Sequence, residues 1–167
     1  MRVSLEQLMN KIGVEGTLRP YETIPFDYFN PDKGLDVMAE VSLSGDGGEI
    51  NVEIQQIEHG ADGKTNFRQI LQLQLEREPT GTFMATSLRH NGQLLSGKKR
   101  NWFEGACRFA KQSIALLKKG TVPDFEAIYK ATIDEAEGNA TAGGSGGGRA
   151  LKGDKAVNKP PGGRGGI

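Results

Sequence analysis

Apolar and polar residues alternate with a period of two through most of residues 35–95. In the first such segment the apolar side carries Leu35, Val37, Ala39, Val41 and Leu43. This alternation is typical of a β-strand with one face buried. The sequence therefore predicts that residue 35 begins a run of half-buried strands.

The pattern continues in later segments that are separated by turn-forming residues. The third predicted strand places Phe67, Leu71, Leu73 and Leu75 on the apolar face, and Asn91-Gly92 is a strong signal for a tight hairpin. The predicted strand segments are residues 35–43, 50–54, 67–75, 83–88 and 93–95. Together they predict an antiparallel meander of four or five strands.

Helical periodicity replaces this alternation at both ends of the predicted sheet. Ser4 and Gln7 match a capping box that begins a short helix ending at Gly13. Residues 101–119 carry a broad apolar stripe and predict a long helix. A capping box at 121–124, with Pro123 as the first helical residue, predicts a second C-terminal helix that ends near Gly138.

Residues 15–34 fit neither period. Their three prolines exclude a continuous helix or a central strand and predict an irregular arm. The arm holds four aromatic residues, Tyr21, Phe26, Tyr28 and Phe29. Two interpretations stay open, because these rings can pack on the body of the protein or offer a platform for bases or a protein partner.

These elements predict an α+β fold, in which a short N-terminal helix and two C-terminal helices pack on one face of the meander. The predicted domain covers residues 1–137. Residues 138–167 hold 11 of the 24 glycines and too few apolar residues to form a core, so they predict a disordered, basic tail.

The charges of the chain are segregated although they sum to zero. Residues 1–88 carry 7 basic and 14 acidic side chains, whereas residues 89–119 carry 8 basic and 1 acidic. Residues 120–137 are acidic again, and the tail carries 5 basic side chains and 1 acidic. Local positive fields of this kind favour polyanionic partners.

The basic residues of 89–119 predict a strip along the long helix that can bind phosphates. The strip consists of Arg89, Lys98, Lys99, Arg100, Arg108, Lys111, Lys118 and Lys119. The tail adds Arg149, Lys152, Lys155, Lys159 and Arg164, in a composition that resembles the Gly-Arg arms of nucleic-acid-binding proteins. The alternative is a solvated helix face whose cations pair with the acidic helix that follows.

The polar side of the strands offers a second candidate surface. It is either plain solvated surface or a surface for another protein. Its residues are Asp36, Glu40, Asn51, Glu53, Gln55, Gln72, Gln74 and Glu76.

The sequence offers little for catalysis. Cys107 lies in the apolar stripe of the long helix, which indicates a buried, inert thiol. His59 and His90 fall in predicted turns, where we expect exposed side chains without a catalytic partner. We therefore expect no enzyme, no cofactor and no metal site, and we interpret the chain as cytoplasmic because it lacks a membrane span and a secretory signal.

The leading hypothesis is a non-enzymatic protein that binds single-stranded DNA or RNA through the basic strip and tail. The alternative is a protein-interaction module, such as an adaptor, chaperone or self-assembling subunit, that uses the aromatic arm or the polar sheet face. Strands followed by a long helix are similar in topology to the Whirly and PUR families of single-stranded nucleic-acid binders, and also to secretion chaperones. No sequence motif accompanies this similarity, so it assigns no family.

Overall fold

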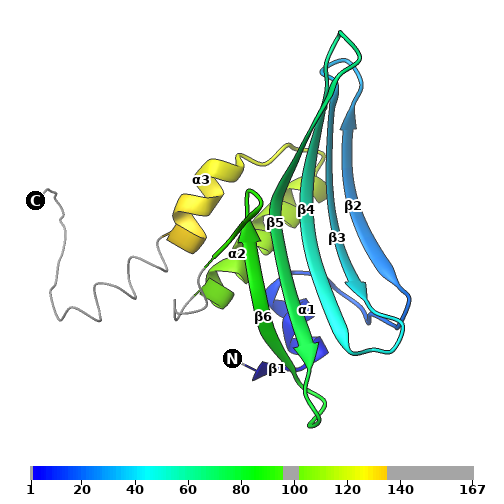
Figure 1. The fold of residues 1–167 in the computed structure, drawn as a ribbon, viewed down its shortest axis with the longest axis vertical. Helices are drawn as coiled ribbons and strands as arrows, with labels where there is room; N and C mark the ends of the chain where they lie inside the picture. The colour runs from blue at the N-terminus through cyan, green and yellow to red at the C-terminus, as the bar shows by residue number, and fades with distance from the viewer. Residues whose placement is uncertain (1, 96–101, 135–167) are drawn as a thin grey trace, which may run out of the picture.

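The computed structural model describes residues 2–95 and 102–134, which form one antiparallel sheet covered by helices on a single face (Figure 1). The strands in chain order are β1 (Arg2–Val3), β2 (Thr23–Asn30), β3 (Leu35–Leu43), β4 (Glu49–His59), β5 (Thr65–Arg77), β6 (Phe83–His90) and β7 (Gln93–Leu94). The helices are α1 (Leu5–Lys11), α2 (Trp102–Lys118) and α3 (Phe125–Tyr129), which continues as the π-helical turn η1 (Lys130–Asp134). The α+β class predicted from the sequence is confirmed.

Strands β3 to β6 form the predicted meander, β2 extends it at one edge, and the spatial order is β1-β6-β5-β4-β3-β2. The short strands β1 and β7 both pair with β6. The described residues therefore form seven strands rather than four or five. The turns follow the expected chemistry, since Asn91 and Gly92 both have positive φ angles, of 51° and 79°, as a tight hairpin turn requires.

The arm predicted to be irregular contains a regular strand, which corrects the sequence-based expectation. Residues 23–30 pair with β3 along their whole length as the edge strand β2. Pro25 is compatible with this place because one side of an edge strand needs no partner for its backbone N–H groups. Proline excluded a central strand here and left an edge strand possible.

The core lies between the sheet and the helices. Strands β3, β4 and β5 contribute alternate residues that are fully buried, including Val41, Val52 and Leu73, which are cross-strand neighbours. From α2, Phe109 and Ile114 meet this face and are also fully buried. Figure 1 shows that β2 to β5 extend past the helices at the end with the β2–β3 and β4–β5 turns.

A β-bulge changes which side of β5 is buried. The register shifts between Ile54 and Gln55, so that Ile70 of β5 becomes an extra, fully buried residue. Phe67 therefore lies on the uncovered face and is 60% exposed. The expectation that Phe67 shares the apolar face of Leu71 is wrong, because the extra residue interrupts the period of two.

The helices begin and pack for identifiable reasons. The Ser4–Gln7 capping box of α1 is present as predicted. Helix α3 starts later than expected, because Asp124 is its N-cap and accepts a hydrogen bond from the Ala127 backbone N–H. Gly105 of α2 allows η1 to approach closely, since a Cβ at this position would lie 3.0 Å from the Cα of Ile133. Glycine at this position therefore allows η1 to pack directly against α2.

Candidate nucleic-acid interface and a charged cavity

Four cations lie along the face of α2 that points away from the core. Arg108, Lys111 and Lys118 belong to α2, and Lys119 follows it directly; all four are exposed. Arg108, Lys111 and Lys118 share one side of the helix because they are three and seven residues apart, which is about one and two helical turns, and Lys119 follows at the edge of the same side. We call this set the α2 ridge. It spans roughly 16 Å at the helical rise per residue.

Neighbouring elements fix two of the ridge side chains. The Lys118 Nζ lies 3.4 Å from the carbonyl oxygen of Gly13 and 5.2 Å from the centre of the Phe26 ring. The Arg108 guanidinium donates to the carbonyl oxygen of Thr132 at 3.3 Å. These contacts hold both positive charges without neutralising them.

No ridge cation forms an ion pair with a carboxylate among residues 2–95 and 102–134. The acid within α2, Glu104, is instead paired with Lys11 of α1, with Nζ–O distances of 2.8 and 2.9 Å. The described part of the acidic segment 120–134 does not pair with the ridge either. No described carboxylate therefore offsets the cations of the ridge.

Arg89 does not belong to the ridge, which corrects the predicted continuous strip. It pairs with Gln72 on the uncovered face of the sheet, whereas its neighbour His90 points to α2 and contacts Phe109. Neighbouring residues of a strand face opposite sides, so the sheet separates Arg89 from the ridge. The remaining predicted cations, Lys98, Lys99, Arg100, Arg149, Lys152, Lys155, Lys159 and Arg164, lie outside the described residues, as does the proposed tail 138–167.

The uncovered face of the sheet carries the polar residues that the sequence assigned to it. Side chains bond across the strands from Gln69 to Glu53 at 2.7 Å, from Gln72 to Asn51 at 3.2 Å, and from Ser87 to Gln74 at 2.8 Å. Apolar side chains join this polar area near the end that extends past the helices. There one cross-strand row consists of Phe29, Asp36, Ile57 and Phe67 in that order, and the two phenylalanines are 63% and 60% exposed.

The four aromatic residues singled out in the arm do not form one platform. Phe26 and Tyr28 lie on the helix side of β2 and pack against the core, whereas Phe29 lies on the uncovered face. Tyr21 precedes the strand, has a positive φ of 68° and is 88% exposed. The packing interpretation thus holds for Phe26 and Tyr28, whereas Tyr21 and Phe29 are exposed.

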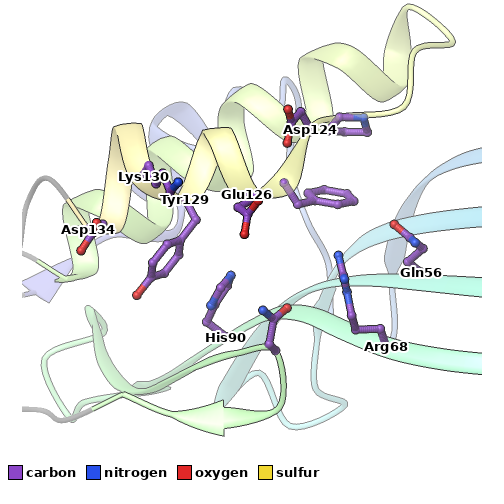
Figure 2. Close-up of a pocket in the computed structure, with 11 residues that line it drawn as sticks. Gln56, Arg68, His90, Asp124, Glu126, Tyr129, Lys130 and Asp134 are labelled. Carbon is purple, nitrogen blue, oxygen red and sulfur yellow. The ribbon is translucent and has the colours of Figure 1, made fainter.

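A cavity of about 600 Å³ opens between α3 and the helix side of the sheet. Arg68 and His90 enter it from the sheet, and Glu126 and Tyr129 enter it from the helix (Figure 2). The other lining residues are Gln56, Asn91, Pro123, Asp124, Phe125, Lys130 and Asp134. The fold brings these residues together from β4, β5, the end of β6 with the turn after it, and the segment 123–134 that contains α3 and η1.

His90 is not the exposed turn residue that the sequence predicted. Its ring stacks on Tyr129, with the ring centres 3.9 Å apart, and meets Phe109 edge-on at 6.1 Å. Burial lowers the pKa of His90 below its ordinary value, and the positive charge of Arg68 lowers it further. His90 ends β6 immediately before the Asn91-Gly92 turn, so the hairpin signal locates the residue but does not reveal its stacking.

Sequence reasoning did not identify Arg68 or Glu126 as site residues. Arg68 sits in an alternating strand and Glu126 in a short helix, and each position alone is typical of solvated surface. They meet because Arg68 pairs with Gln56 on the helix side of the sheet, beneath α3. No local sequence motif predicts that Arg68 and Glu126 line the same cavity.

Cys107 is buried, as the apolar stripe predicted, and burial raises the pKa of its thiol to about 12. The unfolded thiol ionises at lower pH, so this residue stabilises the fold below its ordinary pKa of 9.0 and loses that contribution as the pH rises toward 12.

We expect iodoacetamide at about pH 8 to leave Cys107 of the native protein unmodified and to alkylate it after unfolding in guanidinium. Mass spectrometry of the two samples measures this, and equal alkylation rates would contradict a buried thiol.

Comparisons with protein-family models, with curated proteins and with solved structures find no significant match. Within the described ranges, no helix has the length and apolar character to cross a membrane. The same ranges contain no group of three or more His, Cys, Asp or Glu side chains arranged to hold a metal ion.

Proposed function

We propose that the protein binds single-stranded nucleic acid through the α2 ridge. The observation that carries this proposal is the set of four exposed cations, Arg108, Lys111, Lys118 and Lys119, without a carboxylate partner among the described residues. Cations that stay unpaired in the folded state can release the counterions of a phosphate backbone, which is the main source of affinity for nucleic acid.

The shape of the ridge favours a single strand. The ridge is only about 16 Å long, and a flexible strand can bend to bring successive phosphates onto its four cations. The sequence places Lys98, Lys99 and Arg100 shortly before α2 and five further cations after residue 138, which extend the positive charge available to the same ligand. The acidic face of the sheet repels phosphates and directs the strand to the helix side.

Fluorescence anisotropy of labelled oligonucleotides with the full chain tests this proposal. If four phosphates are contacted, raising the salt from about 50 to 200 mM should weaken single-strand binding roughly 50-fold, since each contact contributes about 0.7 to the logarithmic salt slope. Duplexes of the same sequence serve as the comparison and should bind more weakly. An affinity that does not change with salt, or no binding at the lower salt concentration, would exclude the ridge as a phosphate site.

A second candidate function, a protein-interaction module, is favoured by the exposed rings of Phe29 and Phe67, which lie with Asp36 and Ile57 in one row of the uncovered face. Exposed apolar clusters rimmed by polar residues are typical of protein interfaces. Light scattering coupled to size-exclusion chromatography separates the self-associating form of this function from the first proposal. A stable oligomer whose association weakens in the F29S/F67S variant would support the interface.

A further inference from the structure

The charged cavity under α3 holds a cation that no described residue neutralises. Arg68 has no ion pair among residues 2–95 and 102–134, although Asp124, Glu126 and Asp134 line the same cavity. Figure 2 shows its side chain rising from β5 between Gln56 and His90. An unpaired guanidinium flanked by amide groups is a good receptor for a carboxylate, which it can bind through two parallel hydrogen bonds.

The opposite wall of the cavity is acidic. The Glu126 side chain points from α3 toward the sheet (Figure 2) and has no ion-pair partner in the described part of the chain. Asp124 is already engaged as the N-cap of α3 through the Ala127 N–H. Asp134 lies beyond Tyr129 and away from Arg68 (Figure 2), so Glu126 is the carboxylate that faces Arg68 across the cavity and can accept a hydrogen bond from a cationic ligand group.

Charge balance selects the kind of ligand. The lining carries two cations, Arg68 and Lys130, against the three carboxylates of Asp124, Glu126 and Asp134, so its formal net charge is −1. A free phosphate or a nucleotide would add to this negative charge, whereas a ligand with one carboxylate and two amino cations would balance it.

We propose that this cavity binds a basic amino acid, with its carboxylate on Arg68 and its side-chain cation on Glu126. The flexible stem of lysine or arginine separates the two charged ends, as a ligand that reaches from the sheet to α3 must do. Phe125 and Pro123 offer apolar surface to that stem. The volume of about 600 Å³ is within the range of small-molecule sites. The site shares no residue with the α2 ridge.

Isothermal titration of the full chain with L-lysine tests the proposal, and NMR of the histidine rings locates the binding. We expect a dissociation constant between about 10 µM and 1 mM. The His90 signals should shift on binding, while those of His59, which is exposed at the end of β4, should not. A shift at both histidines, or at neither with about 10 mM lysine, would overturn the proposal.

Variants of the protein and of the ligand test which residue binds the carboxylate and which binds the side-chain cation. R68Q and E126Q should each weaken lysine binding at least about 10-fold, because each removes one charged hydrogen-bonding group. R77Q is the matched control, since Arg77 is an exposed arginine of the same strand outside the cavity lining. Equal weakening by R77Q and R68Q would indicate a general charge effect and contradict the assignment.

L-Norleucine, which lacks the side-chain amine, and L-lysinamide, which lacks the carboxylate, should both bind at least about 10-fold more weakly than lysine. Norleucine binding as tightly as lysine would refute the role of Glu126. The free amino acid and the C-terminal lysine of a peptide share this chemistry. Acetyl-glycyl-lysine, whose backbone amine is blocked, separates the two sources: binding equal to that of lysine assigns a peptide end, and weaker binding assigns the free amino acid.

Discussion

The double charge reversal K111E/K119E is expected to weaken single-stranded oligonucleotide binding roughly 10- to 100-fold at about 50 mM salt. Both lysines are exposed on the α2 ridge and form no ion pair within the described ranges, so their positive charge is available to phosphates. The logarithmic salt slope should also decrease, by roughly 1 to 2, because two phosphate contacts are lost. Lys118 is left unchanged because its ammonium contacts Gly13 and Phe26 and takes part in packing.

The control for this experiment is K33E/K64E, which changes the net charge of the protein by the same amount. Lys33 and Lys64 are exposed near the β2–β3 and β4–β5 turns, at the end of the sheet that extends past the helices (Figure 1). This variant should keep most of the affinity and the salt slope of the unchanged protein. Equal losses in both variants would show that binding follows net charge and not the ridge. Thermal unfolding of both should stay close to that of the unchanged protein, as expected for exposed positions.

The substitution Phe109→Ala is expected to reduce the free energy of unfolding by about 3 to 5 kcal/mol. Phe109 is fully buried on α2, and its ring centre lies 6.1 Å from that of His90 and 6.1 Å from that of Phe125. It thus joins the sheet, α2 and α3, and its truncation leaves a cavity where all three meet. Urea denaturation followed by circular dichroism measures the loss.

Phe109→Leu is the matched substitution for this position. Leucine keeps most of the buried apolar volume, so this variant should lose less than half as much stability as Phe109→Ala. Similar losses in both variants would mean that ring geometry, and not buried volume, determines the contribution of Phe109. A loss below about 1 kcal/mol in the alanine variant would contradict its central place in the core.

The features predicted correctly from the sequence are those set by local rules. The period of two in residues 35–43 and the turn residues Asn91 and Gly92 predicted strands and a hairpin that are present. The Ser4–Gln7 capping box predicted the start of α1 for the same reason, because its partners are only three residues apart. The spacing of Arg108, Lys111 and Lys118 also placed them on one exposed helix face.

The errors arise where distant segments decide the outcome. The start of α3 was misplaced because both 121–124 and Asp124 alone carry capping signals, and packing selects the later one. Arg89 was assigned to the predicted strip because it is close to the long helix in sequence, although it lies on the other face of the sheet. The cavity was missed because Arg68 and Glu126 are 58 positions apart in the chain.

The sequence by itself determined the α+β class, the meander and the cationic face of α2, because hydrophobic period, turn residues and helical spacing act over a few neighbouring residues. Only the tertiary structure decided that residues 23–30 form the edge strand, that the bulge at Ile70 moves Phe67 to the uncovered face, and that Arg68, His90 and Glu126 share a cavity. These outcomes depend on strand register and on how α3 packs over the sheet, and both are set by contacts between residues far apart in the chain.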